Sequence, residues 1–114
     1  MAASVTVHGF TVRASGTQFN GRFATADITT TDGSDTLVFT VPGGDVEYAI
    51  LAVSVCNRAD TSLEQVSIAV STTATPTLPE FIEWNTTLVP HGVLERTQIM
   101  AAAGDNIVIR VGQP

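Results

Sequence analysis

Apolar and polar residues alternate in short runs along most of the chain, and Gly, Pro, Asp and Asn gather between the runs. A period of two is typical of β-strands, because successive side chains of a strand point to opposite faces. No window carries the spacing of an amphipathic helix. The pattern predicts strands over residues 4–13, around Ile28, and over 36–41, 46–57, 66–70, 81–88, 93–100 and 107–111. Seven or eight short strands at this spacing favour an antiparallel β-sandwich, jelly-roll-like in type.

The first run changes phase part of the way along. Val5 and Val7 alternate, Phe10 and Val12 alternate one position out of step, and the slip falls around Gly9. A slip at a glycine is typical of a β-bulge, in which one strand carries an extra residue. We therefore expect a bulge near Gly9.

Three further stretches differ from simple alternation. The run 46–57 is apolar on both faces, which predicts a central strand covered on two sides. Residues 14–26 are rich in Gly, Ala and Thr and give the least clear pattern. In the run 81–88, Ile82, Trp84 and Leu88 fall in register, as on a core face. Tryptophan is also favoured at interface hot spots, so core and interface both remain open for Trp84.

The length of 114 residues fits a single domain. Within it, residues 36–114 form the expected core sandwich, and residues 1–35 supply edge strands or an N-terminal arm that reaches a neighbouring molecule. Charged residues make up 14% of the chain, against about 25% in an average domain. Two interpretations stay open: partners cover part of the surface, or Thr, Ser and Ala form most of it.

The charge balance excludes several classes of partner. Five Arg, no Lys and eleven acidic residues give a formal charge of −6. Phosphate backbones and anionic membranes would repel such a chain, so we expect neither nucleic acid nor membrane as a partner. Cys56 is the single cysteine, cannot form an internal disulfide, and is expected to be a small buried residue. No signal peptide is recognisable, so synthesis in a cytoplasm is expected.

No set of residues has the spacing of a catalytic or metal site. His8 and His91 lack a second ligand at metal-site spacing, and we expect no metal and no cofactor. Glu83 and Glu95, as neighbours across a hairpin, could form a glycosidase pair, but the adjacent Arg96 favours ion pairs. The turn at residues 32–35 is acidic but lacks the EF-hand spacing for calcium. We predict that the protein is not an enzyme and has no catalytic residues.

What remains is binding to other proteins. The N-terminal strand and the segment 14–31 could act as an arm, Trp84 as an anchor, and exposed arginines as partners of carboxylates. The candidate interface residues are Val5, Val7, Phe10, Phe19, Phe23, Trp84, Arg96 and Arg110.

Several segments together resemble a known group of proteins. They are LVFTVPGG at residues 37–44, AILAVSVCNR at 49–58, FIEWNTTL at 81–88 with the Pro90 turn and GVLERT at 92–97, and AGD at 103–105. In this order they resemble small virion structural proteins of tailed bacteriophages, of marine and cyanobacterial phages in particular. The resemblance covers roughly residues 36 to 111, or about two-thirds of the chain, and residues 1–35 fall outside it.

The resemblance implies a β-sandwich without catalytic residues. It also implies a capsid decoration (cement) protein: a homotrimer that binds the major capsid protein on the outer surface of the virion and stabilises the head. Such a protein is made in the host bacterial cytoplasm. Two alternatives remain: a tail, neck or fibre-associated virion protein, and a carbohydrate-binding module. The single Trp and single Tyr argue against the carbohydrate module, because sugar sites usually need several aromatic rings.

Overall fold

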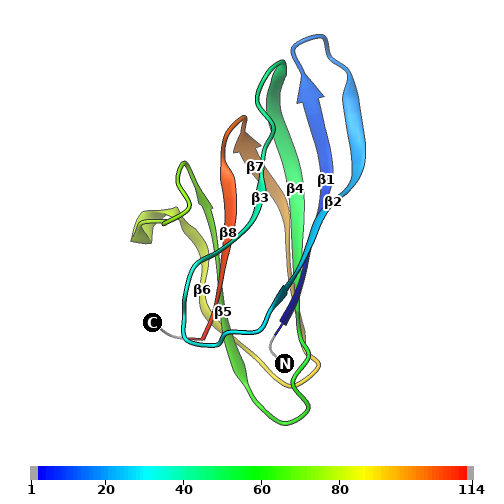
Figure 1. Cartoon of the computed structure of the whole chain (residues 1–114). Coiled ribbons are helices and arrows are strands. Elements are labelled where there is room, and N and C mark those ends of the chain that lie inside the picture. The colour runs from blue at the N-terminus through cyan, green and yellow to red at the C-terminus, as the bar shows by residue number, and fades with distance from the viewer. Residues whose placement is uncertain (1–2, 113–114) are drawn as a thin grey trace.

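A computed structural model of the chain describes residues 3–112 and contains two four-stranded antiparallel sheets packed as a sandwich (Figure 1). Sheet A has the strand order β2-β1-β4-β7, and sheet B has the order β3-β8-β5-β6. The elements are β1 (Ala3–Arg13), β2 (Gln18–Ile28), β3 (Thr36–Thr40), β4 (Val46–Asn57), β5 (Glu64–Ser71), the short 3-10 turn η1 (Leu78–Glu80), β6 (Phe81–Leu88), β7 (Val93–Ala102) and β8 (Asn106–Val111). The predicted antiparallel β-sandwich is confirmed. No helix among the described residues is long and apolar enough to cross a membrane.

The chain passes repeatedly between the two sheets. Only the β1–β2 and β5–β6 connections join strands of the same sheet, and every other connection crosses from one sheet to the other. Repeated crossing of this kind is typical of jelly rolls. Neither sheet is complete without strands from both halves of the chain.

The first strand lies in the interior of sheet A and does not form an arm. β1 pairs with β2 on one side and with β4 on the other. Val5 and Val7 are 1% and 0% exposed and line the core of the chain itself. They are therefore core residues rather than surface residues free to meet a partner. The physical reason is that β1 offers two strand edges and an apolar face, and the remaining strands of the same chain cover all three.

The hydrophobic core lies between the two inner faces. Sheet A contributes Leu51 and Val53 from β4, and sheet B contributes Ile68 and Ile109 from β5 and β8, each at most 1% exposed. A buried polar side chain, Asn57, closes the core at the end of β4. Asn57 donates from Nδ2 to the carbonyls of Ser62 (2.9 Å) and Leu88 (3.1 Å), and its Oδ1 accepts from the N–H of Ala59 (3.0 Å). A buried amide satisfied in this way holds the β4–β5 loop against the end of β6.

The bulge expected near Gly9 is present, but it does not change which face the following residues of β1 point to. The register shifts between Val7 and His8, opposite the extra residue Phe23 of β2. β1 itself keeps its phase: Gly9 and Thr11 lie opposite buried β4 residues and continue the inner face. Gly9 has a φ of 140°, and a Cβ there would collide with the backbone of β4. Phe10 and Val12 consequently point to the outer face of sheet A.

Strand β2 occupies the stretch for which the sequence pattern was least clear. A short strand was expected only around Ile28, whereas β2 runs from residue 18 to 28. Its residues 18–22 are exposed on both faces, so no apolar alternation marks them. The strand is held by backbone pairing to β1, which leaves no signature in side-chain hydropathy.

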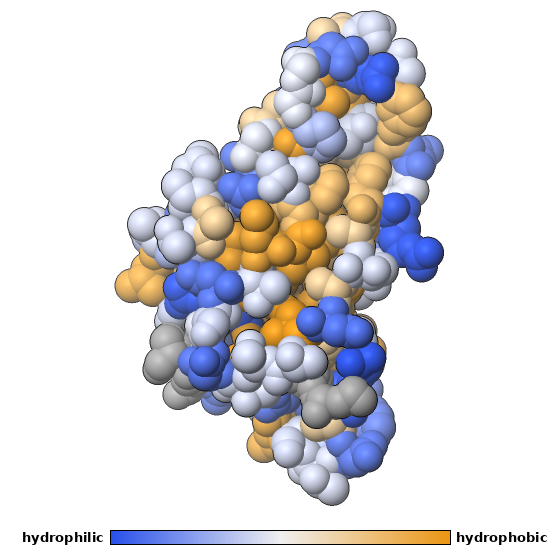
Figure 2. All heavy atoms as spheres, viewed as in Figure 1, coloured by the Kyte–Doolittle hydropathy of each residue, from blue (hydrophilic) through white to orange (hydrophobic). Residues whose placement is uncertain are grey.

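The open edge between β2 and β3 is closed by two aromatic rings. Phe23 and Phe39 stack across the two sheets with ring centroids 5.3 Å apart and an interplanar angle of 11°. Figure 2 shows apolar residues gathered in the middle of the face viewed in Figure 1. β2 and β3 belong to different sheets and are not hydrogen-bonded to each other. The stacked rings provide the contact between them instead.

Truncation of a core residue should show how strongly the fold depends on this packing. Ile68→Ala removes a side chain that is fully buried. We expect the free energy of unfolding to fall by about 3 kcal/mol because the cavity cannot fully collapse. Urea titration followed by Trp84 fluorescence measures the loss. Leu63→Ala, at a 60% exposed loop position, is the control and should change the value by less than about 0.5 kcal/mol. Equal losses in the two variants would contradict the assignment of the core.

Candidate functional site

A bulge in β6 turns Trp84 out of the sandwich. Between Glu83 and Thr86, β6 advances three residues while β5 advances two. Asn85 takes a positive φ of 48°, and its N–H donates to the Oγ of Ser67 (2.9 Å). A bulge re-aims the neighbouring side chain, and Trp84 comes to lie on the outer face of sheet B, 46% exposed.

The placement of Trp84 corrects one interpretation of the sequence. Ile82 and Leu88 pack on the core as expected, but Trp84 does not share their face. The side chains of residues 81–88 do not alternate strictly between the two faces, because the bulge adds one residue to β6. The side chain is accessible to a partner.

Trp84 belongs to a cluster on sheet B, here called the Trp84 cluster, formed by Asp35, Leu78, Phe81, Trp84 and Arg110. Phe81 and Trp84 meet edge to face with centroids 4.9 Å apart. The Arg110 guanidinium lies 4.6 Å from the Phe81 ring centroid and 5.9 Å from that of Trp84. Asp35 accepts from Nε of Arg110 at 2.5 Å. Leu78, Phe81 and Trp84 line a shallow hollow of about 310 Å³.

These contacts give the Trp84 cluster the properties of a protein-binding hot spot. Cation–π and edge-to-face contacts hold the rings in one orientation, so little side-chain entropy is lost on binding. The charge of Arg110 is compensated by Asp35, and their side chains are only 16% and 22% exposed. Arg110 points outward from β8, as its alternation with core residues predicted. The polar partner Asp35 and the apolar partners Leu78 and Phe81 were not among the candidate interface residues named from the sequence.

The outer face of sheet A carries a second uncovered apolar surface. Cross-strand register places apolar side chains of β1, β4 and β7 next to one another in two adjacent rows. We call this surface the sheet A patch; it consists of Phe10, Val12, Tyr48, Ile50, Met100 and Ala102. Met100 is 70% exposed and Tyr48 is 37% exposed. β4 is a central strand, as predicted, but within residues 3–112 nothing covers its second face.

The other half of the same face is mostly polar, apart from Val93, which lies opposite Cys56 and is 63% exposed. His8 Nε2 lies 3.9 Å from Glu95 Oε2, and Ser54 donates to the same oxygen at 2.8 Å. Arg22 lies opposite His8 on β2. Cys56, expected to be buried, is half-buried on this face beside Ser54. The boundary between the apolar and polar halves therefore crosses the middle of sheet A.

The edge between β6 and β7 is closed by an ion pair between the two sheets. Arg96 Nη1 donates to the carbonyl of Ile82 (2.7 Å) and to Oε1 of Glu83 (2.8 Å). Thr86 Oγ1 donates to the other carboxylate oxygen at 2.7 Å. The hydrogen bond from Arg96 and then that from Thr86 hold the pKa of Glu83 below its usual range. Arg96 is consequently engaged within its own chain.

The pair of glutamates considered for sugar hydrolysis does not assemble. Glu83 and Glu95 lie on strands of different sheets, and each has its own partner. A carboxyl group with a lowered pKa is also a poor general acid at neutral pH. This arrangement favours the ion-pair interpretation of Glu83.

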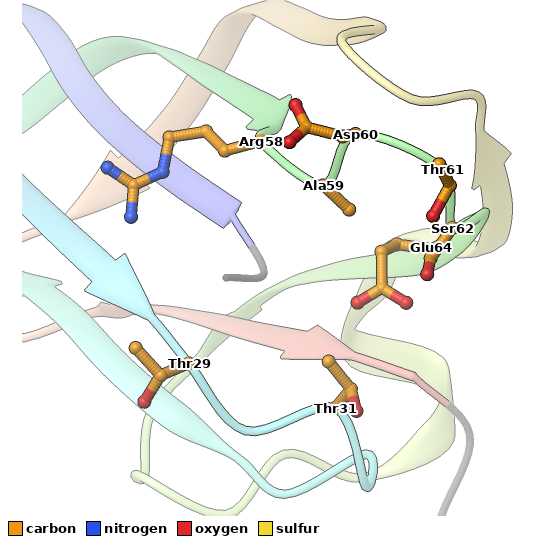
Figure 3. Close-up of a pocket in the computed structure, with 8 residues that line it drawn as sticks. All are labelled: Thr29, Thr31, Arg58, Ala59, Asp60, Thr61, Ser62 and Glu64. Carbon is orange, nitrogen blue, oxygen red and sulfur yellow. The ribbon is translucent and has the colours of Figure 1, made fainter.

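A polar cavity of about 550 Å³ lies between the β2–β3 and β4–β5 loops. Figure 3 shows Thr29 and Thr31 on one side and residues 58–64 on the other. Arg58 extends away from Glu64 in this view, so the charged groups do not converge on one point. Arg58 instead pairs with Asp27 (Nη1 to Oδ1, 3.3 Å). The cavity offers hydroxyl groups but no nucleophile held against a base.

Acidic groups of the described residues are similarly dispersed. Among residues 3–112 no three His, Cys, Asp or Glu side chains gather in a possible metal site. In the acidic turn considered for calcium, Asp32 accepts from the backbone and hydroxyl of Ser34 (3.0 and 2.5 Å), and Asp35 accepts from Arg110. The hydrogen bonds from Ser34 lower the pKa of Asp32.

The remaining aromatic candidates lie around the β1–β2 hairpin. Phe19 is 50% exposed, with the Arg13 guanidinium 4.6 Å from its ring centroid. Phe23 is partly buried against Phe39 and serves the fold. Only Phe10, Phe19 and Trp84 of the apolar candidates therefore present surface to a partner.

The pKa of Glu83 allows a test of the ion pair between the sheets. In Glu83→Gln we expect the free energy of unfolding at pH 7 to be lower by about 1 kcal/mol. A carboxylate whose pKa is lower in the folded state stabilises above its unfolded pKa, and the stabilisation is lost as the pH falls through the folded value. The difference between wild type and variant should therefore shrink as the pH falls through the usual range of a glutamate and vanish below the lowered pKa of the folded state.

Chemical denaturation at pH 7 and at lower pH measures this difference. Glu47→Gln, which removes a carboxylate at an exposed position of β4, is the control at pH 7 and should leave stability unchanged within about 0.5 kcal/mol. A Glu83→Gln variant as stable as wild type at pH 7 would show that the ion pair contributes nothing.

Comparison of the chain with models of protein families, with curated protein sequences and with solved structures found no match.

Proposed function

We propose that the chain is a bacteriophage capsid decoration protein that docks on the major capsid protein through the Trp84 cluster and stabilises the head. The observation that carries this proposal is the exposed, rigidly held ring of Trp84 on a small β-sandwich. The resemblance of residues 36–111 to virion structural proteins of tailed phages supports the same function.

The chemistry of the Trp84 cluster suits a protein surface. A partner that inserts an aliphatic side chain beside Leu78 and Phe81 would bury apolar area at a site that is already ordered. Because Asp35 compensates Arg110, the partner need not supply a charge for it. One such contact gives modest affinity, which a repeating capsid lattice multiplies when several linked copies bind at once.

The number of copies per particle separates this function from its structural alternatives. We expect quantitative mass spectrometry of purified virions to give a ratio to the major capsid protein between about one-third and one, as for copies spread over a symmetric lattice. A ratio of a few per cent would assign the protein to the tail, neck or fibres. Absence from particles would overturn the virion proposal.

A single substitution tests the docking site. Trp84→Ala should weaken binding to capsids that lack the protein by at least about 30-fold, because a hot-spot residue contributes about 2 kcal/mol or more. Co-sedimentation of the purified protein with such capsids measures the affinity. Leu63→Ala, which truncates a similarly exposed apolar residue in a loop, is the matched control. Equal affinity of Trp84→Ala and wild type would remove the Trp84 cluster from the interface.

A carbohydrate-binding module is the second candidate, favoured by the same exposed ring next to a hollow. The face of Trp84 could stack on a sugar ring that enters the hollow lined by Leu78 and Phe81. Specific binding on a glycan array that Trp84→Ala abolishes, together with no binding to capsids, would favour this function over docking on protein.

A further inference from the structure

We infer that the chain associates with a second copy of itself through the sheet A patch, with the outer faces of two A sheets packed together. This inference goes beyond the proposed function and differs from the homotrimer that the resemblance implies, because a contact between two identical faces pairs two copies. It concerns the outer face of sheet A, whereas the Trp84 cluster lies on sheet B. It rests on four properties of the patch: its side chains are contiguous, it carries no charge, its side chains differ in height, and the face around it is large.

The patch is contiguous because it follows the register of three strands. Val12 lies opposite Tyr48, and Tyr48 lies opposite Ala102. In the adjacent row, Phe10, Ile50 and Met100 are aligned in the same way. Scattered apolar residues are normal on a protein surface, but two complete rows across three strands are typical of an interaction site.

The charge of the molecule favours contact between copies at this place. Each copy carries a formal charge of −6, so two copies repel one another over most of their surfaces. None of the six residues of the patch is charged. A partner with a basic surface would gain little by choosing the uncharged patch, whereas a second acidic copy meets no like charge among the six residues of the patch.

The mixture of large and small side chains in the patch suits packing against an identical surface. Large side chains stand beside small ones: Met100 and Tyr48 project, while Ala102 and the neighbouring Ala52 of β4 are low. Two sheets stack about 10 Å apart when projecting side chains of one face fill the low positions of the other. An isologous contact lets the projecting Met100 of each copy fill a low position of its partner.

The whole outer face of sheet A approaches the size of a standard interface. Four strands at about 4.8 Å spacing and ten residues at about 3.4 Å each give a face of about 650 Å². A standard interface buries about 800 Å² on each partner, with an apolar centre and a polar rim. The apolar patch would form the centre, and Arg22, His8 and Glu95 would form part of the rim.

The position of the patch leaves the remainder of the molecule free. It lies toward the end of the sandwich that carries the β1–β2 hairpin, at the top of Figure 1, while β1 begins and β8 ends at the opposite end. The Trp84 cluster is on the other sheet. A self-associated protein could therefore still present two or more Trp84 clusters to a repeating surface.

The molar mass of the purified protein in solution tests this inference. Sedimentation equilibrium of the full chain from about 1 to 100 μM should reveal association of wild type, since an interface of this size usually holds in that range. Met100→Glu places a charge within the patch, on its β7 side, at a side chain that is 70% exposed and therefore not part of the core. It should weaken self-association by at least about 100-fold, because a carboxylate buried without a partner is strongly unfavourable.

The control is Leu63→Glu, which adds the same charge at a 60% exposed position outside the patch and should associate like wild type. Trp84→Ala should also remain associated, so failure of the capsid-docking proposal would not affect this inference. A monomeric wild type at 100 μM, or a Met100→Glu variant that associates as strongly as wild type, would overturn it. Urea denaturation of each variant verifies that it is folded.

Discussion

β1 hydrogen-bonds to β2 on one side and to β4 on the other, and the rest of the sandwich depends on this double pairing. It places the N-terminal strand in the interior of sheet A, where Val5 and Val7 meet the core residues of sheet B. It also fixes which residues of β1 face outward. Because side chains alternate along a strand, the inward position of Val7 and Thr11 requires that Phe10 and Val12 point away from the core.

A sandwich of two layers buries only one face of each sheet, and this limit explains the surfaces of the molecule. The outer face of sheet A retains apolar residues that no third layer covers. The outer face of sheet B retains the Trp84 cluster. The first surface follows from strands that are apolar on both faces, and the second follows from the bulge in β6 that turns Trp84 outward.

The two edges of the sandwich are closed in chemically different ways. Phe23 and Phe39 stack between β2 and β3, whereas Arg96 joins Glu83 and the carbonyl of Ile82 between β7 and β6. Two of the side chains that the sequence suggested for partners, Phe23 and Arg96, are thus used within the fold. The same residue types serve interfaces and edge closure, since both require contacts across a gap between two backbones.

Alternation and turn residues alone were enough to predict the β-sandwich and most of the strands, because hydropathy with a period of two follows directly from burial of one face. They missed residues 18–22 of β2, which backbone pairing holds without an apolar face. They also could not distinguish an inner from an outer apolar face in the runs 4–13 and 46–57. The tertiary structure decided those faces, since they depend on which strands lie alongside. It also decided the exposure of Trp84, through a bulge stabilised by Ser67 of a neighbouring strand, and the pairing of Asp35 with Arg110 across 75 residues. No local pattern encodes a contact whose two partners meet only after the sheets have formed.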